Sequence, residues 1–135
     1  MWTFHLRKGV KFHGNYGELT ADDVVFSLKR AGDSKTSSFS ADYASVDKIE
    51  AVDPLTVKIT LKSPIPSLLG IVANYHGGNI VSKKAVEERG DNFRIQPIGT
   101  GPFAFEGYKP NESVTLVAHA NYFRGKPKID KILYR

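Results

Sequence analysis

The chain has 135 residues, of which 41% are hydrophobic and 24% are charged, and it contains no cysteine. This length and balance are typical of one globular domain and exclude wholesale disorder and collagen-like repeats. The absence of cysteine excludes disulfides, thiolate zinc sites and cysteine nucleophiles.

The net positive charge of the chain comes from its two ends. The net charge is +5, but the middle of the chain is slightly acidic. Nucleic-acid binding generally needs a clustered cationic face. Solvated surface lysines are therefore the favoured interpretation. A stand-alone basic α+β module that binds nucleic acid or another polyanion through its terminal strands stays open as an alternative.

The first predicted elements are a strand and a helix. A strand or hairpin arm is predicted over residues 2–12, because Trp2, Phe4 and Leu6 alternate with polar residues. A helix is predicted to follow, with apolar residues at helical spacing from Val24 to Ala31, and Gly32 is predicted to end it. Thr20 suits its N-cap, and Asp23 stands three residues later, as in a shortened capping box.

A loop and a hairpin follow. Residues 33–45 are rich in serine and are predicted to form a surface loop that carries Phe39 and Tyr43. Residues 46–61 alternate between apolar and polar on both sides of a turn at Asp53 and Pro54, which predicts a β-hairpin.

The rest of the chain predicts two short helices and three strands. The helices are expected at about 66–73 and at 83–89, with a loop at 74–79 between them. The strands are expected at 103–108, 113–119 and 128–134. About six strands and three short helices make the fold class α+β, with a mainly antiparallel sheet.

No local motif encodes catalysis or a metal site. His5, His13, His76 and His119 lie far apart in the sequence, and no zinc-binding helix motif occurs. Metal-dependent hydrolysis would need His5, His13 or His119 to converge with carboxylates in space. The glycine-rich run 99–101 leads into a strand rather than a helix, which argues against a phosphate loop. We therefore expect no enzyme, no metal and no cofactor.

Aromatic residues in loops are the candidates for a binding site. Phe39, Tyr43, Tyr75 and His76 stand outside the periodic elements, and loops on a rigid scaffold commonly line ligand sites. The competing interpretation is that each of these side chains packs back onto the core.

Five phrases occur in order along the sequence: WTFHLRKGVKFH with LTADDVVFS at 2–27, VDP with TVKITL at 52–61, IVSKKAV at 80–86, PIGTGPF at 97–103 and ANYFRGKP at 120–127. Together they resemble the extracytoplasmic solute-binding proteins of family 5, which are the dipeptide-, oligopeptide- and nickel-binding components of ABC importers. The turn after His13 is one residue longer than is usual in that family and lacks its aspartate.

The resemblance implies a piece of a larger, bilobal protein with the type II periplasmic-binding-protein fold. Residues 1–98 would form part of an extra subdomain of the N-terminal lobe. Residues 99–135 would supply strands that return into that lobe. The family's main anchors for peptide termini lie in the second lobe, which this chain does not contain. The predicted strands also lie very close to both ends of the chain, which favours a fragment of a longer protein.

The function that the resemblance implies is non-catalytic capture of peptides or a similar small solute for import. The expected partners are that solute and an ABC permease in the membrane, with no nucleic acid, and self-association of the fragment is left open. The expected location is the periplasm, or the outside of a Gram-positive cell on a lipid anchor. The ligand-binding residues are expected to be Phe39, Tyr43, Tyr75, His76, Gly77 and Gly78.

Overall fold

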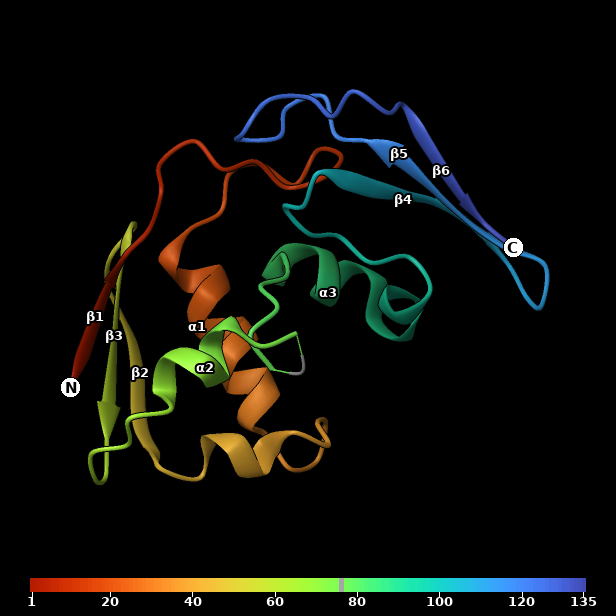
Figure 1. Ribbon diagram of the computed structural model, residues 1–135. Helices are drawn as coiled ribbons and strands as arrows, with labels where there is room; N and C mark the ends of the chain where they lie inside the picture. Colours follow the sequence, from red (N-terminus) through yellow and green to blue (C-terminus); the bar gives the residue numbers. More distant parts are fainter. Residues whose placement is uncertain (76) are drawn as a thin grey trace. The chain divides into compact units, whose positions relative to one another are not determined.

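The computed structural model describes residues 1–75 and 77–135 (Figure 1). The chain forms two structural units, each built from two separate segments of the sequence. Unit 1 consists of Met1–Lys8 and Thr20–Lys83, and unit 2 consists of Gly9–Leu19 and Lys84–Arg135. The predicted division after residue 98 concerns the place of each segment in a larger protein, and it remains a prediction.

Unit 1 is built on a three-stranded antiparallel sheet with the order β1-β3-β2. The strands are β1 (Trp2–His5), β2 (Val46–Asp53) and β3 (Thr56–Leu61). The hairpin of β2 and β3 is confirmed. The first strand is shorter than predicted, because its pairing with β3 ends at His5 and Thr56, and Lys11 forms only an isolated bridge with Glu18.

Helices cover one face of this sheet. Figure 1 shows α1 (Ala21–Gly32) and α2 (Leu68–Ala73) on the same side of β1, β2 and β3. Val24 and Leu28 on α1 are buried, as are Val57 and Ile59 on the central strand. Because side chains alternate across a strand, Val57 and Ile59 share the covered face, as the period-2 pattern predicts.

The predicted start of α1 is confirmed by its capping contacts. The backbone N–H and the hydroxyl of Thr20 each donate to Asp23 Oδ2, both at 3.0 Å. The other carboxylate oxygen of Asp23 accepts the backbone N–H of Lys83 at 3.0 Å. Asp23 therefore fixes the helix start and ties it to the distant segment at residue 83.

Two details of unit 1 differ from the prediction. The loop 33–45 contains a single 3₁₀ turn, η1 (Ser40–Tyr43). Helix α2 begins at Leu68 rather than near residue 66, because Ser67 is its N-cap and supplies the first carbonyl acceptor, to Ile71 N–H at 3.0 Å.

Unit 2 has its own antiparallel sheet, with β5 between β4 and β6. The strands are β4 (Phe103–Lys109), β5 (Ser113–Ala118) and β6 (Lys131–Tyr134), and the helical segments are α3 (Lys83–Arg89), whose first residue belongs to unit 1, and η2 (Gly90–Arg94). The last strand starts later than predicted, because its pairing with β5 begins at Lys131 and Val117. The α+β class with antiparallel sheets is confirmed.

Candidate functional site

A polar hollow lies in unit 1, beside the C-terminal half of α1. Its volume is about 400 Å³, which is within the size range of small-molecule sites. Its lining residues come from α1, from the loop that follows α1, and from the segment that follows α2. They are Ser27, Arg30, Ala31, Thr36, Ser37, Ser38, Phe39, Gly77, Asn79 and Val81.

Helix α1 contributes one face to the polar hollow. Ser27, Arg30 and Ala31 are spaced by three and four residues, so they lie on one side of the helix. Ser27 is buried, and its hydroxyl donates to the Asp23 carbonyl at 2.7 Å and accepts Val81 N–H at 3.0 Å. Within residues 1–75 and 77–135, the exposed guanidinium of Arg30 has no hydrogen-bond or ion-pair partner.

The loop after α1 is shaped by short side-chain bonds to its own backbone. Asp33 Oδ1 accepts Lys35 N–H at 2.9 Å, and the Ser37 hydroxyl accepts Phe39 N–H at 3.1 Å. Such bonds stabilise turns built from Asp and Ser. They bring Phe39 to the rim of the polar hollow with 38% of its surface exposed.

Gly77 and Tyr43 meet beneath the polar hollow. Tyr43 is buried, with 5% of its surface exposed, and its hydroxyl donates to the Gly77 carbonyl at 2.9 Å. Tyr43 is not among the residues that line the hollow, whereas Gly77 is. The structure thus places these two predicted site residues in contact, with Gly77 at the surface of the hollow and Tyr43 packed against Gly77.

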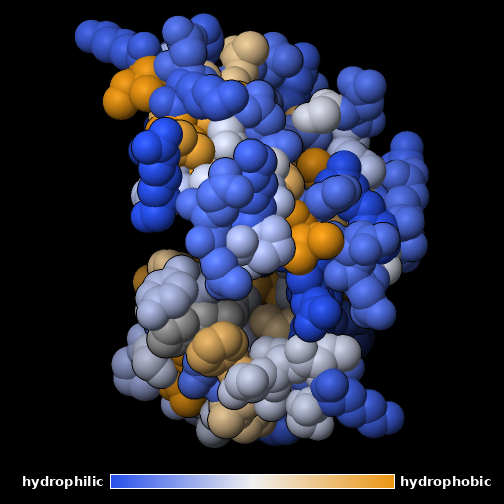
Figure 2. All heavy atoms as spheres, turned by 90° about the vertical axis from the view of Figure 1, so that its right-hand side faces the viewer, coloured by the Kyte–Doolittle hydropathy of each residue, from blue (hydrophilic) through white to orange (hydrophobic). Residues whose placement is uncertain are grey.

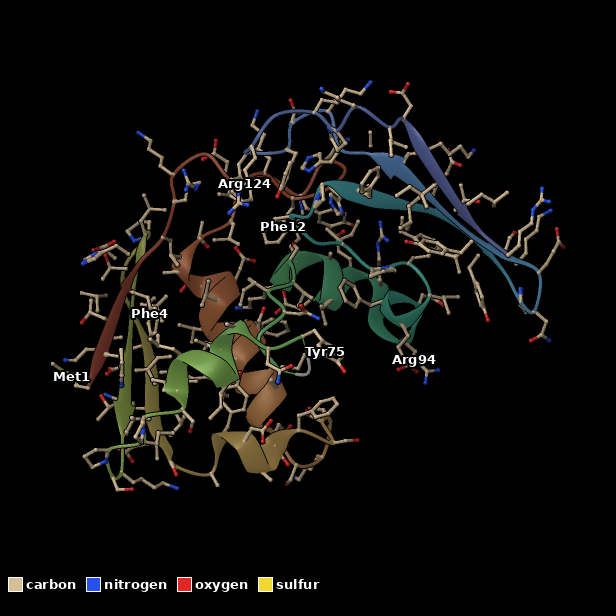
Figure 3. All side chains as sticks on the ribbon, viewed as in Figure 1. Met1, Phe4, Phe12, Tyr75, Arg94 and Arg124 are labelled. Carbon is tan, nitrogen blue, oxygen red and sulfur yellow. The ribbon has the colours of Figure 1, made fainter. Side chains whose placement is uncertain are left out.

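The remaining predicted residues are placed differently. Tyr75 is 75% exposed and points outward from the loop after α2 (Figure 3), and it does not line the polar hollow. Gly78 lies against the end of α2 and lines a separate apolar hollow. His76 lies outside the described residues. The ligand role of all six residues stays a prediction.

The polar lining residues of the hollow were not among the predicted site residues: they are Ser27, Arg30, Thr36, Ser37, Ser38 and Asn79. The spacing of Ser27 and Arg30 was an available signal, because two polar residues three apart share a helix face. No local signal pointed to Asn79, since its place depends on how the chain returns from α2.

The separate apolar hollow lies between the sheet and helices of unit 1. It has a volume of about 170 Å³ and is lined by Phe4, Leu6, Val24, Leu28, Val57, Ile59, Val72, Gly78 and Ile80. Phe4 projects from β1 toward this interior (Figure 3). It is a gap in the core whose lining residues carry no polar side chain to orient a ligand.

In unit 2, two of the three histidines considered for a metal site lie together. The rings of His13 and His119 meet edge to face, 4.8 Å between centroids, while His5 is exposed on β1 in unit 1. Among the described residues, no group of three or more histidine, aspartate or glutamate side chains could hold a metal ion.

Both histidines converge on one backbone carbonyl. His13 Nδ1 accepts Gly99 N–H at 3.3 Å, so the ring proton sits on Nε2, which donates to the Gly101 carbonyl at 2.9 Å. His119 Nδ1 lies 3.2 Å from that carbonyl oxygen. Burial lowers the pKa of His13, and the nearby His119 lowers it further, while the bond to Gly101 opposes both.

The surface in Figure 2 is mostly hydrophilic, with hydrophobic side chains in small groups between polar ones. None of the helices in the described part of the chain is long and apolar enough to cross a membrane.

In the comparison with protein families, residues 1–135 match the model described as "Bacterial extracellular solute-binding proteins, family 5 Middle". Among curated proteins, the chain is 33% identical to di/tripeptide-binding protein 2 of Pseudomonas aeruginosa, covering 98% of this chain and 29% of that protein. It is 35% identical to the glutathione-binding protein GsiB of Salmonella choleraesuis, covering 99% of this chain and 26% of that protein.

Among solved structures, the chain is similar to the solute-binding protein MoaA of A. tumefaciens R10, determined in complex with mannopinic acid. The two are 58% identical with a TM-score of 0.98, over 99% of this chain and 27% of MoaA. The chain therefore spans between a quarter and a third of the length of these relatives.

Proposed function

This chain belongs to family 5 of the bacterial extracellular solute-binding proteins, and on that premise we propose that the protein that carries it captures a small solute for import by an ABC permease. Its relatives in the family are binding proteins, two of them named for peptides or glutathione. The proposed role of the chain is to supply one wall of the binding site.

The observation that carries the proposal is the 58% identity to MoaA at a TM-score of 0.98. The ligand of MoaA is an acid by name, and the solute we favour for this protein is mannopinic acid or a similar organic acid. Peptides are the second candidate, because the curated relatives named above bind them or glutathione.

The chemistry of the polar hollow supports an acidic, hydrogen-bonding solute. Arg30 offers a guanidinium, Ser38 a hydroxyl and Asn79 an amide from three different segments. A guanidinium is well suited to bind a carboxylate through two parallel hydrogen bonds. Phe39 at the rim offers flat apolar surface to the rest of the solute.

The test is calorimetric titration of the full-length protein that carries this chain with mannopinic acid, glutathione and a tripeptide. We expect heat of binding with mannopinic acid and a submicromolar to micromolar dissociation constant. Saturable binding of glutathione or the tripeptide, without binding of mannopinic acid, would show that the solute is a peptide rather than an organic acid. The absence of binding to all three solutes, with a folded protein, would contradict the proposal.

Phe39 is proposed to contact the solute at the rim of the polar hollow. Replacing Phe39 with alanine in the full-length protein should weaken binding about tenfold, since it removes an aromatic contact surface. Unfolding temperature should change little, because Phe39 is partly exposed. Unchanged affinity would remove Phe39 from the site.

Arg30 is proposed to bind the carboxylate of the solute. Arg30→Gln should weaken mannopinic acid binding about tenfold or more, because it removes a charge-assisted hydrogen bond. Lys29→Gln is the matched control: it removes the same charge from the next position of α1, and Lys29 does not line the polar hollow. Equal losses in the two variants would indicate a general charge effect and would contradict a specific role for Arg30.

The remaining parts of the proposal follow from the family. The protein would be non-catalytic and would act in the periplasm or, lipid-anchored, at the outer surface of a Gram-positive cell. Residues 1–98 would form part of an extra subdomain and residues 99–135 part of the N-terminal lobe. Tyr75, His76, Gly77 and Gly78 would lie on a loop that faces the binding cleft of the whole protein.

A further inference from the structure

Tyr43 is held in a slot between two glycines. A Cβ atom at Gly32 would lie 3.1 Å from Tyr43 Cβ, and a Cβ atom at Gly77 would lie 2.9 Å from Tyr43 Cε2. A Cβ atom at Gly77 would come closer than real contacts allow and would displace the ring, and one at Gly32 would press on the base of the side chain. The two glycines therefore allow the ring to pack between the end of α1 and the loop after α2.

The Tyr43 hydroxyl then makes a buried hydrogen bond to the Gly77 carbonyl, at 2.9 Å. Burial raises the pKa of Tyr43, and the negative charge of Asp42 raises it further, so the phenol stays protonated and donates at neutral pH. A buried carbonyl that lost this donor would bear an unmet desolvation cost, which favours movement of the loop.

The segment 77–81 is fixed at its other end as well. Val81 N–H donates to the buried Ser27 hydroxyl at 3.0 Å. Between these two fixed points lies Asn79, which lines the polar hollow. Its side-chain amide also donates to the Tyr75 carbonyl at 3.0 Å. The orientation of Asn79 thus depends on a short span tethered by Tyr43 and Ser27.

We propose that Tyr43 is a positioning residue for solute binding: it holds Gly77, and through it Asn79, in place at the polar hollow without touching the solute. This inference rests on the proposed function, and it offers an indirect role for Tyr43 in place of the direct contact expected from the sequence. The buried position of the ring, behind Gly77, is the reason.

The first test is Tyr43→Phe in the full-length protein, titrated with mannopinic acid. Phenylalanine keeps the packing between the glycines and removes only the hydroxyl, so the variant should fold and bind about tenfold more weakly. Tyr16→Phe is the matched control, because it removes a phenolic hydroxyl that accepts Arg89 Nε–H at 3.2 Å in unit 2. The control should keep wild-type affinity.

The second test separates positioning from general loss of stability. If Tyr43 acts through Asn79, then Tyr43→Phe should weaken binding much less in an Asn79→Ala background than in the wild type. Independent, additive losses would overturn the inference, as would wild-type affinity in Tyr43→Phe.

A measurement without ligand tests the inference even if mannopinic acid is not the solute of this protein. Amide hydrogen exchange across 77–81 should be faster in Tyr43→Phe than in the wild type, and unchanged in Tyr16→Phe. Unchanged exchange in Tyr43→Phe would contradict the tether itself. Failure of the wild type to bind any solute would contradict only the proposed function.

Discussion

Replacing Gly78 with alanine is expected to destabilise unit 1 by at least about 3 kcal/mol, because the new methyl group has no room. A Cβ atom at Gly78 would overlap the carbonyl group of Val72 and would lie 2.8 Å from the carbonyl oxygen of Asn74. These are backbone atoms at the end of α2, so they cannot move aside as a flexible side chain could. The backbone N–H of Gly78 also donates to the Asn74 carbonyl, at 2.7 Å.

Gly70→Ala is the matched control for this substitution. Gly70 lies within α2, and a Cβ atom there would meet nothing within 4 Å. Alanine at an open helical position should raise stability by about 0.5–1 kcal/mol. Urea denaturation of the two variants should therefore give shifts of opposite sign, and a Gly78→Ala midpoint close to the wild type would contradict the steric argument.

Much of the fold was predictable because its signals are local. Thr20 and Asp23 mark the start of α1 within four residues, and the alternation on both sides of Asp53 and Pro54 marks the hairpin. The pairing of β1 with β3 was not predictable, because alternation tells which side chains share a face and not which strand lies alongside. The division of the strands between two sheets was missed for the same reason.

The candidate site was predictable only in part. Phe39 was expected from its loop position and Gly77 from the family resemblance, and both line the polar hollow. Tyr43 stands in the same loop as Phe39 and is buried, since its ring fits between Gly32 and Gly77, which lie 45 residues apart in sequence. A pocket for an aromatic ring that is made by two distant glycines leaves no local pattern.

Loss of the His13 side chain is expected to destabilise unit 2. Replacing His13 with alanine should lower the free energy of unfolding by about 2–4 kcal/mol, because it leaves a cavity and removes a partner from Gly99 N–H. The imidazole joins residue 13 to both ends of the Gly99–Gly101 turn, through bonds of 3.3 Å and 2.9 Å. In this variant the Gly101 carbonyl would still have His119 Nδ1 as a partner, at 3.2 Å. This remaining contact limits the loss of stability.

The same geometry makes the stability of unit 2 depend on pH. Protonation would place a hydrogen on Nδ1, opposite Gly99 N–H, and would bring a charge into a buried site beside His119. Burial is the main reason that the folded chain holds the pKa of His13 below its ordinary value of 6.5, and His119 adds to it, although the bond to Gly101 opposes both. The unfolded chain binds this proton more readily than the folded chain does. The stability that neutral His13 adds to unit 2 is therefore fully present above about pH 6.5, and it is lost as the pH falls toward the pKa of His13 in the folded chain.

Urea denaturation at about pH 7.5 and about pH 5 tests this dependence. The wild type should lose more stability on acidification than His13→Gln, which cannot take up the proton. His5→Gln should behave as the wild type does, because His5 is exposed on β1. Equal acid sensitivity in His13→Gln and the wild type would mean that the bond from Gly99 N–H to the imidazole does not depend on the neutral ring, and the tautomer assigned from the two distances would be wrong.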